Sequence, residues 1–168
     1  MEKKLAESII IPEGTGKKEK YDLLIPQLRE LVRGEPDLIA NTANVMAALK
    51  ETFGFFWVGI YFVKKDNGNE TLVLGPFQGP VACTRIQKGK GVCGTSWNEK
   101  RTVVVEDVGK FPGHIACSAL SKSEIVVPVI SKGEVTAVID IDSDRFSAFD
   151  EIDALYLEEV ARIISVCG

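Results

Sequence analysis

Residues 125–142 read IVVPVISKGEVTAVIDID, two apolar, β-branched runs separated by Lys132-Gly133. A lysine-glycine pair between such runs is typical of a hairpin turn. Because successive side chains of a strand point to opposite faces, the second run has one apolar face, made of Ala137, Ile139 and Ile141. Its opposite face carries Thr136, Val138, Asp140 and Asp142. The hairpin therefore predicts a sheet with one face packed against helices and another face ending in two carboxylates.

The segments on both sides of this hairpin predict the rest of the architecture. Amphipathic helices are expected over about 19–33, from 38 to 53 and after Asp150. Further strands are expected at 55–63, 71–78, 81–86 and 102–106, with a short helix near Val92 and a long irregular loop over 107–122. The order predicts an α+β domain over residues 19–168, preceded by an extension at 1–18. About six antiparallel strands would carry the terminal helices on one face and a ligand pocket on the other.

Aromatic and acidic side chains are expected to meet on the pocket face. In the strand 55–63, FFWVGIYFV, Trp57 and Tyr61 share one face with Gly59. If this strand lies beside the one that carries Asp140 and Asp142, both rings line a pocket that the carboxylates flank. Glu124, just before the hairpin, would add a third acid. Such a pocket suits a small ligand with an apolar group and a cation, although strand-end acids are as often turn caps and aromatic residues more often belong to a core.

Composition narrows the class of protein. The chain has 168 residues and a formal net charge of −4, which argues against nucleic acid as the main partner. No apolar run approaches the roughly 20 residues of a membrane helix, and the N-terminus does not resemble a signal peptide. We therefore expect a cytoplasmic protein without a membrane partner, in a compartment where disulfides are usually transient and catalytic.

Three cysteines fall within 35 residues and carry the chemical hypothesis. Cys83, Cys93 and Cys117 each have small or polar neighbours, as accessible thiols do. A zinc site could be drawn from them together with the single histidine, His114, but no CxxC spacing supports it. Since a sulfur-based turnover cycle needs a second thiol to resolve the first, the pattern favours thiol redox catalysis. Cys167, beside the C-terminus, is expected to be incidental.

The segments around these cysteines resemble a known family. GPVACTRI (79–86), GKGVCGTS (89–96), GHIACSALSKSEIVVPV (113–129) and DIDSDRFSAFDEID (140–153) are similar to the free methionine-(R)-sulfoxide reductases, enzymes built on a GAF domain. The resemblance implies a GAF-like fold and reduction of free methionine sulfoxide. It implies no metal and no organic cofactor, and it names thioredoxin as the reductant. A homodimer is left open.

The same resemblance implies roles for individual residues. Cys117 would attack the sulfoxide and become a sulfenic acid. Cys83 would then condense with that sulfenic acid, and Cys93 would take part in a disulfide that is presented to a reductant. Which of Cys83 and Cys93 attacks first is left open. For substrate binding, the resemblance implies Trp57, Tyr61, Glu124, Asp140 and Asp142.

Two other functions fit the sequence less well. A GAF sensor of a nucleotide or another small molecule would not need three cysteines, and such sensors usually have an output domain in the same chain. A redox-sensing protein, whose disulfide switches a partner, would use the cysteines without turning over a substrate.

Overall fold

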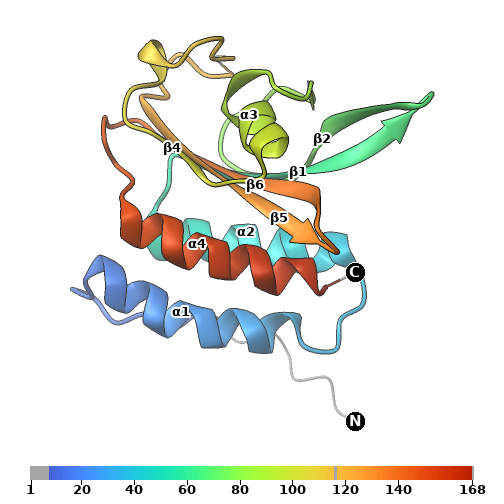
Figure 1. Ribbon diagram of the computed structural model, residues 1–168. Helices are drawn as coiled ribbons and strands as arrows, with labels where there is room; N and C mark the ends of the chain where they lie inside the picture. Colours follow the sequence, from blue (N-terminus) through green and yellow to red (C-terminus); the bar gives the residue numbers. More distant parts are fainter. Residues whose placement is uncertain (1–7, 116, 168) are drawn as a thin grey trace.

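A single antiparallel sheet organises the molecule (Figure 1). The computed structural model describes residues 8–115 and 117–167. Within these residues six strands follow the order β3-β2-β1-β6-β5-β4. The strands are β1 (Trp57–Asp66), β2 (Asn69–Gln78), β3 (Arg85–Ile86), β4 (Val103–Val105), β5 (Ser123–Ser131) and β6 (Glu134–Ser143). This confirms the predicted fold class and the hairpin at Lys132-Gly133, which joins β5 to β6.

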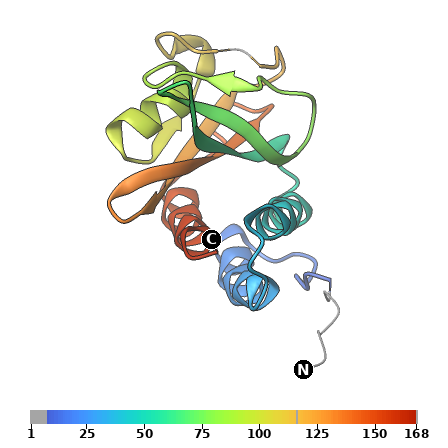
Figure 2. The same ribbon diagram turned by 90° about the vertical axis from the view of Figure 1, so that its right-hand side faces the viewer.

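Two long helices, α2 (Leu38–Phe53) and α4 (Glu151–Ser165), cover one face of the sheet. A third, α1 (Lys17–Val32), packs on the far side of these two, and a shorter helix lies on the other face of the sheet (Figure 2). The opposite face carries α3 (Gly91–Glu99), a 3-10 turn at Val108–Lys110 and the long loop that follows it. None of the helices in the described ranges has the length and apolar character needed to span a bilayer.

The strand faces divide the core as the alternation predicts. Ala137, Ile139 and Ile141 of β6 pack with the three long helices. Val138, from the opposite face of the same strand, packs with Trp57 and Tyr61 in a second cluster. One cluster therefore lies between the sheet and the long helices, and the other lies on the opposite face of the sheet, where the predicted site residues Trp57 and Tyr61 are.

One predicted strand is shorter than expected. The run 81–86 was expected to be extended throughout, yet only Arg85–Ile86 pairs with β2. Gly79-Pro80 precedes the run, and proline cannot donate to a ladder. Val81, outside the paired part of the run, is 87% exposed. Cys83 therefore lies in a connecting segment and not within the sheet.

Candidate active site

Strand register brings the three predicted acids together. β1 and β6 are neighbours, with Trp57 opposite Asp142 and Gly59 opposite Asp140. On the other side of β6, Glu124 of β5 lies opposite Asp142. The condition on which the predicted pocket rested, that these two strands are adjacent, is therefore met.

The aromatic wall is built on β1 and fixed by two hydrogen bonds. The Trp57 Nε1 group donates to the Pro80 carbonyl at 2.9 Å, and the Tyr61 hydroxyl donates to the Cys83 carbonyl at 2.9 Å. Both bonds tie the wall to the segment that carries Cys83. The two ring centroids are 6.1 Å apart.

A third ring, Phe77, belongs to this wall and was missed in the sequence. It stacks on Trp57 with a centroid distance of 5.4 Å. A Cβ atom at Gly59 would collide with the Trp57 ring and lie 2.6 Å from the Phe77 Cβ, so glycine is required for this packing. The β1–β2 register shifts after Gly59, so simple alternation along β2 does not place Phe77 on the face of Trp57.

The acids are buried and resist ionisation. Glu124 is 6% exposed and Asp140 is 7% exposed. Burial raises the pKa of the Glu124 carboxyl well above its usual range, and the nearby Asp142 raises it further. Burial likewise raises the pKa of Asp140, with added repulsion from Glu124 and Asp142. Like charges in so small a space disfavour full ionisation, so the cluster retains protons.

Asp142 differs from the other two acids because a hydroxyl group of the long loop donates a hydrogen bond to it. Burial raises its pKa, while the Ser121 hydroxyl donates to its Oδ1 atom and opposes that rise, as does His114. In contrast, the Oδ1 atom of Asp140 is buried without a hydrogen-bond partner among the described residues. Asp142 therefore ionises more readily than the other two acids. Asp140 has an oxygen atom available to a ligand.

The long loop contacts the acids at two points, His114 and Ser121. His114 Nε2 lies 3.5 Å from Glu124 Oε2, and Ser121 bonds Asp142. Between them, Ile115 lies beside the start of α3, where a Cβ on Gly91 would meet its side chain at 3.2 Å. The contacts of His114 and Ser121 with the acids were not predicted, because an irregular loop has no periodicity that reveals its neighbours.

The loop also carries the reactive sulfur chemistry. Cys117 forms a disulfide with Cys83, and their Cα atoms are 5.7 Å apart. The bond joins the loop to the segment that is anchored by Tyr61. Two predicted redox cysteines are thereby brought together beside the aromatic wall.

Cys93 lies elsewhere in the site. It is a free, buried thiol on α3. Its sulfur and one oxygen each from Glu124 and Asp140 all lie within 4.8 Å of one another. Burial raises the pKa of this thiol well above its usual value, and both acids add to the rise. The start of a helix favours a thiolate through its dipole, but here desolvation and two acids outweigh that effect.

A metal ion bound by Cys93, Glu124 and Asp140 would have to displace the protons of these groups. Their sulfur and two oxygens could serve as ligands to a divalent ion, but each group favours its protonated form here. The zinc set drawn from the sequence cannot form in this state, since the sulfurs of Cys83 and Cys117 are bonded to each other. Cys167 is also a free, buried thiol, and it donates to the Ile163 carbonyl at 3.1 Å.

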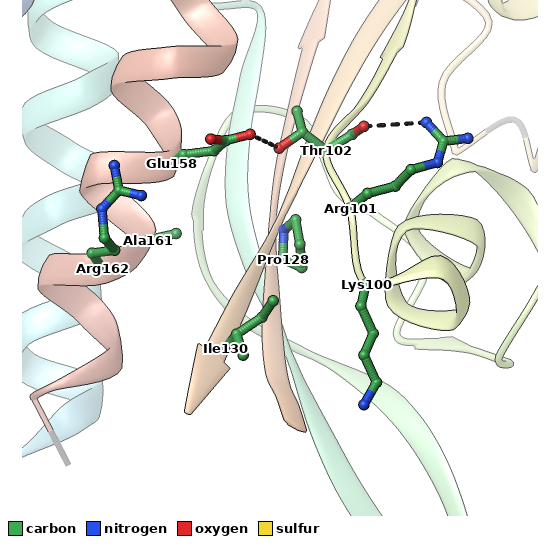
Figure 3. A pocket seen from close by; sticks show the side chains of 8 residues that line it. All are labelled: Lys100, Arg101, Thr102, Pro128, Ile130, Glu158, Ala161 and Arg162. Atoms are coloured by element: carbon green, nitrogen blue, oxygen red, sulfur yellow. Dashed lines mark hydrogen bonds between the residues drawn. The ribbon is translucent and has the colours of Figure 1, made fainter. Parts of the chain in front are cut away.

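A hollow of about 390 Å³ lies away from these residues, between α4, β5 and the turn after α3 (Figure 3). Its charged side chains already have partners in the chain. Lys100 pairs with Glu134 at 3.0 Å, and Arg162 pairs with Glu159 at 2.8 Å. Glu158 accepts a bond from Thr102 at 2.6 Å. None of the predicted site residues lines this hollow, so it plays no part in the proposed chemistry.

Comparison with known proteins identifies first the fold and then the family. Residues 37–167 match the family model of the GAF domain. Free methionine-R-sulfoxide reductase from Saccharomyces cerevisiae is 40% identical, over 95% of this chain and 92% of its own length. The enzyme of that name from Escherichia coli is 43% identical, over 86% of each chain.

A solved structure extends this similarity to three dimensions. The X-ray structure of free methionine-R-sulfoxide reductase from Neisseria meningitidis, in complex with its substrate, is 52% identical with a TM-score of 0.88. The match covers 92% of each chain. The chain belongs to the free methionine-R-sulfoxide reductases, a family of GAF-domain proteins.

Proposed function

We propose that this protein reduces free methionine (R)-sulfoxide to methionine, with Cys117 as the nucleophile and Cys83 as the resolving thiol. The observation that carries the proposal is the Cys83–Cys117 disulfide beside a wall of aromatic rings and buried acids. The substrate named for the Neisseria meningitidis relative has the features that such a wall would bind: an apolar S-methyl end, a polar sulfoxide and an ammonium group.

The first step transfers oxygen from substrate sulfur to protein sulfur. The Cys117 thiolate attacks the sulfoxide sulfur while a protonated carboxyl gives its proton to the sulfoxide oxygen. The substrate sulfur gains two electrons and leaves as the thioether of methionine. The Cys117 sulfur loses two electrons and holds the oxygen as a sulfenic acid.

The second step closes the disulfide. The Cys83 sulfur attacks the sulfenic acid of Cys117, the S–O bond breaks, and water leaves. The resulting disulfide is the bond present in this structure. A dithiol reductant then supplies two electrons and two protons to restore both thiols. We propose thioredoxin for this role and the cytoplasm as the compartment.

The acids divide the remaining work according to their surroundings. Asp142 accepts a bond from Ser121 and is proposed to hold the substrate ammonium as a carboxylate. Asp140 and Glu124 are the acids whose raised pKa keeps a proton for the sulfoxide oxygen. Trp57 and Tyr61 would contain the S-methyl group, because methyl and sulfur atoms pack well on aromatic rings.

Cys93 retains a proposed part in recycling through exchange with the disulfide. The disulfide between Cys83 and Cys117, together with the buried, free state of Cys93, supports the proposal that Cys83 performs the first resolving step. Cys93→Ser should therefore leave the release of one methionine per protein intact. A lower steady-state rate in that variant would support the exchange, and an unchanged rate would exclude it.

One coupled assay tests the proposal against both alternatives. NADPH oxidation is followed with thioredoxin and its reductase, with free methionine (R)-sulfoxide as substrate and the (S) epimer as the matched control. Turnover on the (R) epimer alone supports the enzyme. A sensor would bind a ligand without consuming NADPH, and a redox switch would consume one equivalent and stop.

The Cys83→Ser variant separates the two chemical steps. It should release about one methionine per protein in a single turnover, because Cys117 still performs the first step. Its steady-state turnover with thioredoxin should fall strongly. Loss of the single-turnover methionine as well would contradict the assigned roles.

A further inference from the structure

The two segments that the disulfide joins differ in charge from the rest of the chain. Residues 79–98 and 108–123 contain no aspartate or glutamate. Their cationic residues are Arg85, Lys88, Lys90, Lys110 and Lys122. All five are exposed, whereas the whole chain has a formal net charge of −4. These two segments are therefore basic, and Lys110 pairs at 3.6 Å with Asp107, which directly precedes the second segment.

Exposed apolar side chains lie close in sequence to both disulfide cysteines within these same segments. Val81 precedes Cys83 by two residues and is 87% exposed. Ile115 and Leu120 flank Cys117 and are 38% and 63% exposed. The disulfide brings the two segments together, and the contact of Ile115 with Gly91 places the α3 start, after Lys90, beside them. Figure 1 shows the loop and α3 at the same end of the molecule, away from the three long helices.

We propose that Val81, Ile115 and Leu120, with the cations around them, form the docking surface for a protein dithiol reductant. This inference rests on the proposed function, which needs the disulfide to be reopened in every cycle. The occupant is specified by chemistry: its thiol must reach the disulfide, its contact surface must be apolar, and acidic residues must border that surface. A disulfide between the same two segments favours a thiol protein over any other partner, because a disulfide is opened by an attacking thiolate.

The exchange on this surface balances as a two-electron transfer. The partner's thiolate attacks the sulfur of Cys117 and not that of Cys83, because Cys117 is exposed and Cys83 is half-buried. The Cys83–Cys117 bond breaks and Cys83 leaves as a thiolate. The partner's second thiol then attacks the mixed disulfide, which releases Cys117 and leaves the partner oxidised. The apolar contacts would hold the two proteins together during both steps, and the cations would accelerate their encounter.

Reduction of the oxidised protein, without any sulfoxide, tests the surface directly. The second-order rate constant for thiol appearance is measured with a thioredoxin-class protein and, separately, with dithiothreitol. The Val81→Ser/Leu120→Ser double variant should react about tenfold or more slowly with the protein reductant, since a few central apolar contacts dominate most interfaces. Its rate constant with dithiothreitol should be unchanged, because a small dithiol needs no docking surface.

The matched control is Leu155→Ser/Val166→Ser, on or just after α4 across the sheet, where the wild-type side chains are 61% and 81% exposed. It should behave as wild type with both reductants.

Raising the ionic strength from about 0.05 M to about 0.5 M should lower the rate constant only with the protein reductant, because salt screens the charges that act when the two proteins meet.

Three outcomes would overturn the docking surface. The first is an unchanged rate constant of the Val81→Ser/Leu120→Ser variant with the protein reductant, and the second is an equal fall of its rate constant with dithiothreitol. The third is a wild-type dimer that this variant dissociates, because a second copy would then be the occupant. Neither measurement involves methionine sulfoxide, so a failure of the proposed function would appear separately, as absent sulfoxide turnover with dithiothreitol.

Discussion

Buried acids lie on both faces of the sheet, and their hydrogen-bond partners differ between the two faces. The helix face is the one covered by the long helices, and the loop face is the one that carries α3 and the long loop. On the helix face, Asp153 is 1% exposed and accepts from the Tyr21 hydroxyl at 2.8 Å and from Lys17 at 2.6 Å. It also caps the backbone at the start of α4. On the loop face, Asp140 is equally enclosed by the fold but keeps an oxygen without a partner among the described residues.

The difference indicates that Asp153 stabilises the fold, whereas Asp140 has an oxygen atom available to a ligand. A buried carboxylate costs stability unless donors or cations satisfy it. Asp153 has both, so its charge supports the packing of α1 on α4. Asp140 has repulsive neighbours and a protonated thiol, so the fold tolerates it at a cost. Such an imbalance is typical of sites that bind a cation or move a proton.

The largest expected effect is on the loop face, at Cys117. Cys117→Ser should lower turnover by more than about a thousandfold, because no other group takes over the oxygen from the sulfoxide. Under reducing conditions its free energy of unfolding should change by less than about 0.5 kcal/mol, since the residue is exposed. The coupled NADPH assay and urea unfolding measure the two quantities. Retained turnover would remove the catalytic assignment.

The next largest effect is expected on the helix face, and on stability alone. Asp153→Ala should lower the free energy of unfolding by about 3 kcal/mol, because it leaves the buried Tyr21 hydroxyl without an acceptor and removes a cap. The kcat/KM of the folded fraction should not change. The matched control is Glu151→Ala, an exposed acid on the same turn. A similar loss in both variants would mean that Asp153 is an ordinary helix-end charge.

The third largest effect is expected on the loop face, in the kcat/KM of an Asp142 variant. Asp142→Asn should lower kcat/KM by about ten- to a hundredfold, the loss expected when a buried, charge-assisted contact is removed. Its free energy of unfolding should change by less than about 1 kcal/mol, because the Ser121 bond can persist to an amide oxygen. Kinetics and unfolding are measured on the same preparation. If Asp140→Asn and Asp142→Asn both keep wild-type kinetics, these acids are structural.

Alternation along β1 and β6 was sufficient to predict this face of the site. Trp57, Tyr61, Asp140 and Asp142 were placed correctly because a strand's side chains obey a period of two and the two strands are adjacent. The pairing of Cys83 with Cys117 could not be chosen from spacing. It depends on how a segment broken at Pro80 and an irregular loop meet in space, and neither has a periodic pattern.

The partners of the acids were unpredictable for the same reason. His114 and Ser121 reach Glu124 and Asp142 from the loop, through contacts that only the folded chain defines. The burial of Cys93 also depended on tertiary structure. Its glycine neighbours suggested an accessible thiol, yet the loop and the acids enclose it.

The smallest effect should appear in the pH dependence of stability, at Asp140. Its folded-state pKa lies well above the ordinary value of 3.8, so the native state binds more protons than the unfolded state above that pH. Stability due to this group is therefore complete at acid pH and is lost as pH rises through the folded-state pKa. Asp140→Asn cannot ionise and should escape this loss. At pH 7 it should be more stable than wild type by about 1 kcal/mol, the scale of one poorly satisfied buried polar group.

Urea unfolding under reducing conditions at pH 4 and pH 7 measures this difference. The gain should vanish near pH 4, where the wild-type carboxyl is protonated in the folded state. Asp66→Asn, an exposed acid at the far end of β1, is the matched control and should show no gain at either pH. A destabilised Asp140→Asn protein at pH 7 would mean that Asp140 is satisfied as Asp153 is, and the contrast between the two faces would then not hold.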